Sequence, residues 1–241
     1  MLLANTALVF ITIFTSTISG AIGMAGGILL LSAMTFFLSI DMIVPIHGMV
    51  QLASNSTRSL ILRQHFNKNL IISFALGVPL GAIVSTYLIT TIQDKRYFFL
   101  AIAIIIFFAL FKPKKFKMEI PDKAFFVVGV CVGFLGLFVG ATGPFIAPFF
   151  LGARFSKQEV VANKAILQVI GHFIKIPVFL SLGFNYQDHF LLIGTMIIAS
   201  IIGTKIGTKL LSKINDKIFA LFFKSALLVS AIRLLFKFFS Y

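Results

Sequence analysis

The sequence predicts an all-α, polytopic membrane protein, and its composition, segment lengths and internal repeat each lead to that fold class. Of its 241 residues, 59% are hydrophobic and 12% are charged, and the mean hydropathy is +1.05. A chain of this composition cannot expose an ordinary polar surface to water, so we expect the lipid bilayer to be its solvent. The net charge of +14 does not indicate nucleic acid as a partner, because the basic residues punctuate apolar segments instead of lining a polar domain.

Apolar segments follow one another along the chain, and most are close to the ~20 residues that a helix needs to span a bilayer. They are 3–21, 24–40, 43–62, 69–91, 97–111, 122–140, 142–153, 158–182, 187–209 and 217–238. The first has no basic start, so we expect it to be a mature segment and not a signal peptide. Ala25–Leu38 and Thr142–Gly152 would cover only roughly 15–20 Å as helices. Each is therefore expected to be a half-span or one limb of a re-entrant hairpin.

The basic residues are distributed unequally between the two sides of the predicted membrane. Twelve lie on one side, in the loops 63–69, 112–123, 154–157 and 209–217. The other side carries Lys95, Arg96 and Lys237. The positive-inside rule therefore predicts a multi-pass protein with both termini extracytoplasmic. The same rule places the KPKKFK segment, 112–117, in the cytoplasm.

The chain also repeats itself. GAIVSTYLITTIQDKRYF (81–98) aligns without gaps with GTKIGTKLLSKINDKIFA (203–220), and GMAGGI (23–28) lies over GATGPF (140–145). Each half then contains about five helical segments, the second of which is short and follows a glycine-rich break. Because five is odd, the second copy must run through the membrane in the opposite sense, which is the inverted repeat of many secondary transporters.

This duplication also sets the expected domain organisation. Residues 1–112 form the N-terminal transmembrane repeat, and 122–241 form the C-terminal one. A basic cytoplasmic linker, 113–121, joins them. We expect the two repeats to pack into one integrated membrane domain.

Polar residues recur at matched positions of the two repeats when PIHGMVQLASNSTRSL (45–60) is laid over ANKAILQVIGHFIKIP (162–177). They are His47, Gln51, Asn55 and Arg58 in the first and Lys164, Gln168, His172 and Lys175 in the second. Steps of 4, 4 and 3 keep each set on one helix face, which in lipid must turn toward protein or water. Two alternatives stay open: hydrogen bonding that only joins neighbouring helices, and snorkelling of Lys164 to the nearer membrane surface.

The charge of the ligand expected at this site follows from the positions of the acidic residues, which all fall in loops or at segment ends. Buried Arg58 and Lys175 then lack countercharges, so an anionic ligand is expected. The glycine-rich breaks open short helices whose free N–H groups suit an oxyanion. The residues expected to bind it are Gly23, Gly26, Gly27, Gln51, Asn55, Arg58, Gly140, Thr142, Gly143, Pro144, Gln168, His172 and Lys175. His47 and His172 are candidates for proton coupling, because imidazole titrates near neutral pH.

The two glycine-rich breaks, the polar stripes after them and the two aligned repeat endings resemble the sulfite exporter TauE/SafE family over essentially the whole chain. The resemblance implies an inner-membrane permease for small sulfur-containing anions such as sulfite, thiosulfate or organosulfonates, or for related organic anions. The family's first break is usually richer in glycine and is followed by a proline. Here Ala25 and Ile28 occupy it, and no proline precedes Pro45.

The expected function is secondary transport of such an anion by alternating access at the repeat interface, with Gln51 and Gln168 donating hydrogen bonds. An anion channel would use the same cationic lining and is the alternative. An intramembrane enzyme is less favoured, because the sequence offers no defensible Ser/His/Asp set, HExxH motif or buried carboxylate pair. A single cysteine, Cys131, excludes a thiolate cluster, and no metal or cofactor is expected. The expected partners are the small anion and the lipid bilayer, and the oligomeric state is left unassigned.

Overall fold

The computed structural model describes residues 2–88, 91, 94, 96–111, 119–151 and 154–239, and throughout these residues the regular structure is helical. The helices are α1 (Leu2–Ile22), α2 (Gly26–Met34), α3 (Ile40–Ile61), α4 (Lys68–Leu88), α5 (Arg96–Phe111), α6 (Phe125–Val139), α7 (Gly143–Ile146), α8 (Lys157–Phe173), α9 (Lys175–Ser181), α10 (Phe190–Lys213) and α11 (Asp216–Phe239). Short 3₁₀ turns are η1 (Arg63–His65), η2 (Asp122–Ala124), η3 (Ala147–Phe150) and η4 (Tyr186–His189). The predicted all-α fold is confirmed. Lys95 and most of the predicted linker, including 112–117, lie outside the described residues.

Six of the described helical segments are long and apolar enough to cross a membrane. Their outward faces carry large apolar side chains, among them Phe10 on α1, Ile83 on α4 and Leu191 on α10, each more than 60% exposed. Such side chains would be unfavourable in water and are suited to lipid. The chain is therefore a multi-pass membrane protein.

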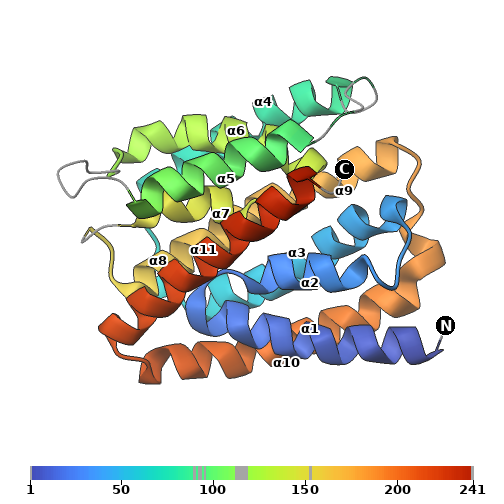
Figure 1. Cartoon of the computed structure of the whole chain (residues 1–241), viewed down its shortest axis with the longest axis horizontal. Coiled ribbons are helices and arrows are strands. Elements are labelled where there is room, and N and C mark those ends of the chain that lie inside the picture. The colour runs from blue at the N-terminus through green and yellow to red at the C-terminus, as the bar shows by residue number, and fades with distance from the viewer. Residues whose placement is uncertain are drawn as a thin grey trace.

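Two close helix pairs form opposite sides of the bundle. α1 lies along α10, α4 lies along α6, and α3 and α8 cross between them (Figure 1). Glycines make both pairings possible: a Cβ on Gly81 would overlap the carbonyl oxygen of Val130, and one on Gly207 would overlap that of Thr17. Small residues of this kind let membrane helices approach until their backbones touch.

The two segments expected to be short are short helices. α2 has nine residues and α7 has four. Each follows a break that contains residues with a positive φ angle. Gly23 has φ 80° and Gly140 has φ 78°, while Ala25, a residue with a Cβ, has φ 71°. The predicted glycine-rich breaks therefore occur at the positions where the sequence places them.

The segment expected at 158–182 is not one uninterrupted helix, because α8 ends at Phe173 and α9 begins at Lys175. Pro177 explains the division. It has no N–H to donate to the carbonyl of Phe173 four residues earlier, and its ring disfavours a regular helix at that turn. Lys175 consequently lies at the first position of a new helix.

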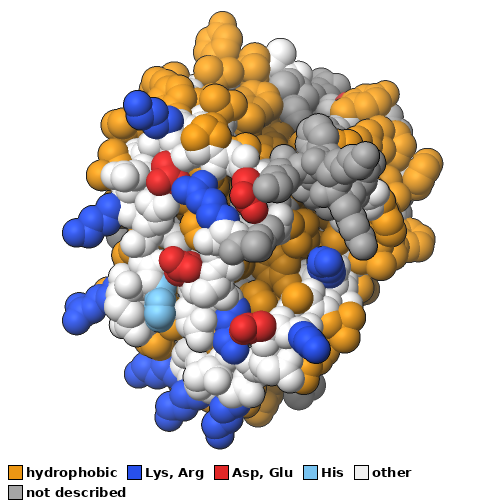
Figure 2. Space-filling model, turned by 90° about the vertical axis from the view of Figure 1, so that its left-hand side faces the viewer, with side chains coloured by type: hydrophobic (Ala, Val, Ile, Leu, Met, Phe, Trp, Pro, Cys, Tyr) orange, Lys and Arg blue, Asp and Glu red, His pale blue; other side chains and the backbone are white. Residues whose placement is uncertain are grey.

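Four loops meet at one end of the bundle. The Asn67 side chain donates to Asp122 over 3.0 Å, and its backbone N–H donates to Asn163 over 2.8 Å. Arg154 pairs with Asp122 as well. Lys157 reaches Asp216 over 3.1 Å, which adds the loop before α11. Lysine and arginine side chains crowd this basic end (Figure 2), whereas both chain ends lie at the opposite end (Figure 1).

Candidate functional site

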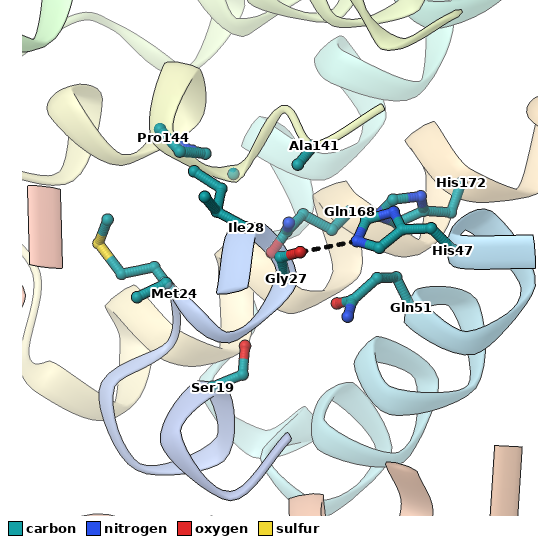
Figure 3. A pocket seen from close by; sticks show the side chains of 12 residues that line it. Ser19, Met24, Gly27, Ile28, His47, Gln51, Ala141, Pro144, Gln168 and His172 are labelled. Carbon is teal, nitrogen blue, oxygen red and sulfur yellow. Dashed lines mark hydrogen bonds between the residues drawn. The ribbon is translucent and has the colours of Figure 1, made fainter. Parts of the chain in front are cut away.

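A small buried cavity lies where the two glycine-rich breaks face α3 and α8 (Figure 3). Its lining residues are Ser19, Met24, Ala25, Gly27, Ile28, His47, Gln51, Ala141, Gly143, Pro144, Gln168 and His172. The cavity volume is about 10 Å³, roughly the space that one water molecule needs. Residues from both predicted repeats therefore converge on one closed space.

Two glutamines line this central cavity, one from each long polar helix. A Cβ on Gly27 would lie 3.2 Å from Oε1 of Gln51, and a Cβ on Gly143 would lie 2.9 Å from Nε2 of Gln168. Each amide thus lies directly against the glycine at the start of a short helix. Any larger residue at either glycine would displace the amide.

Two histidines border the same cavity. His47 Nε2 donates a hydrogen bond to the carbonyl oxygen of Gly27 over 2.8 Å (Figure 3). The ring of His172 lies edge-on to that of His47, with centroids 5.9 Å apart. In the described part of the structure, neither Nδ1 atom has a hydrogen-bond partner, although both are buried. Buried polar atoms without partners are uncommon and indicate a place for a ligand or a proton.

Lys175 lies just outside the cavity lining. Its buried ammonium donates to the carbonyl oxygen of Gly140 over 2.6 Å. The stem passes Gly48 in the middle of α3 and Gly136 near the end of α6, where a Cβ would lie 3.7 Å and 3.3 Å from it respectively. Lys175 is close enough for its charge to act on both His47 and His172, so one cationic group lies beside two imidazole rings.

The structure distributes the predicted site residues over the cavity and its surroundings. Those that line it are Gly27, His47, Gln51, Gly143, Pro144, Gln168 and His172. Those outside the lining are Gly23, Gly26, Asn55, Arg58, Gly140, Thr142 and Lys175. Gly26 has a packing role, because a Cβ there would overlap the carbonyl oxygen of Thr15 on α1. Asn55 and Arg58 lie further along α3, and the Asn55 amide donates back to the Gln51 carbonyl over 2.8 Å.

Lys164 does not snorkel. It is fully buried, and its ammonium donates to the carbonyl oxygen of Gly23 over 3.1 Å and lies 4.8 Å from the ring centre of Phe223. That alternative is wrong because Phe223 of α11 lies over the ammonium, a long-range contact that the local sequence does not reveal. Ser19 and Ala141 also line the cavity without having been predicted. Their closeness in the sequence to the two glycine-rich breaks is the signal that could have identified them.

A bundle of membrane-length helices with a polar, cation-bordered cavity at two helix breaks defines a helical membrane protein with an internal site for a small polar ligand. The family described as sulfite exporter TauE/SafE matches residues 8–234. The chain therefore belongs to this family, a family of membrane transporters, and the predicted resemblance is confirmed. No curated protein and no solved structure matches the chain.

Proposed function

We propose that the protein is a secondary transporter that moves sulfite, thiosulfate, an organosulfonate or a related small anion across the cell inner membrane. The observation that carries the proposal is the sign of the charge buried inside the bundle. Lys175 next to the cavity and Arg58 further along α3 are buried, whereas all seven acidic residues, each within the described part of the chain, are at least partly exposed. Buried cations without carboxylates are stabilised by an anion.

The cavity offers suitable donors for such an anion. The amide of Gln51 and that of Gln168 each supply two N–H groups, and the nearby Lys175 supplies positive charge. A carboxylate in this place would bind a cation instead. The donor set therefore favours a small oxyanion over a metal ion or an amine.

The histidines add a route for proton coupling. Because Nε2 of His47 keeps its proton and donates a hydrogen bond to the Gly27 carbonyl, the Nδ1 atom of a neutral ring can only accept a hydrogen bond. Protonation turns that Nδ1 into a donor for an anion in the cavity. Anion binding and proton uptake would then favour each other, as symport requires.

Alternating access is supported by how the helices pair. Exchange of the two predicted repeats turns the α1–α10 pair into the α6–α4 pair and leaves α3 against α8 and α5 against α11, and all of these pairs are in contact. A cavity of about 10 Å³ is too small for a sulfur oxyanion until the two halves move apart. A site this narrow, lined by residues of both predicted repeats, favours a transporter over an anion channel with a continuous pore.

The test is sulfite uptake into liposomes by the purified protein, measured together with its melting temperature. Wild type should show saturable uptake. Lys175→Ala should fold, because the loss of an uncompensated buried charge relieves a desolvation cost, yet its uptake should fall at least tenfold. Lys175→Arg should retain part of the uptake, limited by the geometry of guanidinium.

Lys224→Ala provides the matched control, because Lys224 is exposed on α11 and should be neutral. If Lys175 only joins helices, Lys175→Ala will melt at a lower temperature while the folded fraction still takes up sulfite, which would end the proposal. Uptake that never saturates, with unitary currents in a planar bilayer, would establish the channel instead.

A further inference from the structure

Arg58 is the least compensated charge among the described residues. Its side chain is fully buried on α3. Nη2 donates to the hydroxyl of Ser54 over 3.3 Å, but Nε and Nη1 have no partner in the described part of the structure. A guanidinium carries five N–H donors and cannot give up its proton inside a protein. Two of its three nitrogens therefore lack an acceptor.

A second buried cation lies on α8, the helix that crosses α3. Lys164 on α8 is fully buried, and its charge and that of Arg58 repel each other. α3 and α8 are in direct contact, so this repulsion acts where the two helices cross at the centre of the bundle. Lys164 is partly compensated by the Gly23 carbonyl and by the face of Phe223, neither of which carries a formal charge. Among the described residues, the partners of Arg58 and Lys164 are thus all uncharged.

This pair is separate from the cationic group at the cavity. Lys175 passes Gly48, ten residues before Arg58 on the same helix, which corresponds to about 15 Å at 1.5 Å per residue. The pair also lies toward the basic end of the bundle. Asn163, the neighbour of Lys164 on α8, donates to the carbonyl of His65 over 3.2 Å in the turn that follows α3.

We propose that Arg58 and Lys164 form a second anion site, between the central cavity and the basic end, that holds a small oxyanion. The oxygens of such an anion accept from Nε and Nη1 of Arg58 and from the ammonium of Lys164, and its charge removes the repulsion between the two side chains. The second site extends the proposed function to a path with two binding sites. The anion binds between Gln51 and Gln168 at one of them and between Arg58 and Lys164 at the other. The second site rests on the proposed function only for the identity of the anion.

The test uses purified full-length protein in detergent and measures melting temperature against sulfite, with gluconate keeping the ionic strength constant. A ligand that binds only folded protein raises stability in proportion to ln(1 + [L]/Kd). The background variant is Gln51→Ala/Gln168→Ala, which removes the central donors. A sulfite-dependent rise in this background that disappears on adding Arg58→Met, and on adding Lys164→Met, supports the second site.

Arg63→Met in the same background is the matched control, because Arg63 is exposed at the basic end and should leave the rise intact. Without sulfite, Arg58→Met should melt at the same or a higher temperature, since the repulsion is gone. The proposal is overturned if sulfite gives no rise in the background variant, or if Arg58→Met lowers the melting temperature and leaves the rise unchanged. Sulfite uptake by liposomes that contain the wild-type protein is measured separately. The proposed transport and the proposed second site can therefore fail independently.

Discussion

At the scale of single residues, Ala25 is the clearest sign of strain. It lies between the end of α1 and the first turn of α2, at φ 71° and ψ −43°, where a side chain with a Cβ is disfavoured. Glycine occupies the other two positive-φ positions of the breaks, Gly23 and Gly140. The structure therefore explains physically why glycine is preferred in this break, and why the alanine costs free energy.

Ala25→Gly should raise the free energy of unfolding by about 0.5–1 kcal/mol, because relief of strain exceeds the entropy that glycine adds to the unfolded chain. The melting temperature of the purified protein checks this. The same substitution inside α2, Ala33→Gly, should change stability in the opposite direction by a similar amount, since glycine weakens a helix interior. Destabilisation by both substitutions would show that the Ala25 backbone is not strained.

At the scale of helices, α4 and α6 pack with their backbones in contact, because glycines line the surface between them. The contact is reciprocal: Gly77 and Gly81 on α4 meet backbone atoms of α6, while Gly129 and Gly133 on α6 meet backbone atoms of α4. In lipid, where water does not drive helices together, such van der Waals contact between backbones is a main source of association.

Gly81→Ala should therefore lower the free energy of unfolding by about 1–3 kcal/mol, because the new methyl group would overlap the Val130 carbonyl oxygen and push the helices apart. Gly194→Ala on α10 is the control. A Cβ there meets nothing within 4 Å, so better helix propensity should leave stability unchanged or higher by up to about 1 kcal/mol. Equal melting temperatures for the two variants would contradict the close α4–α6 contact.

The sequence was most informative about the helices and least informative about how their polar side chains meet. Length and hydropathy are local properties, so α4 and α10 were predicted to within a few residues. The division at Ile174 was missed, although Pro177 signalled it. The 4, 4, 3 spacing correctly predicted that Gln51 and Gln168 share buried surroundings. It could not show that Arg58 and Lys164 are buried on two helices that pack together, because that arrangement depends on the crossing of α3 over α8.

At the scale of the whole molecule, charge is segregated between the two ends of the bundle. The loops around Asn67, Asp122, Arg154 and Asp216 meet at one end, where basic side chains predominate (Figure 2). The positive-inside rule assigns this end to the cytoplasm and the termini to the other side of the membrane.

Cysteine labelling in intact cells tests that orientation. In a Cys131→Ala background, which removes the native thiol, Lys123→Cys at the basic end should be protected from a membrane-impermeant thiol reagent. Gln187→Cys, in the turn between α9 and α10, should react, because it is exposed at the opposite end. The reverse labelling pattern would invert the topology, and reaction of both residues in sealed cells would dismiss it.

The small volume of the cavity also has a consequence for the hydration of the proposed anion. An oxyanion in bulk water carries a shell of several water molecules, and a space of about 10 Å³ admits roughly one. An anion held between Gln51 and Gln168 would therefore exchange most of its shell for protein donors. The electrostatic cost of that exchange rises with the square of the ionic charge, because it is a solvation energy. Among oxyanions of similar size, the singly charged form should thus pass more readily than the doubly charged one, which makes dehydration itself a basis for selectivity.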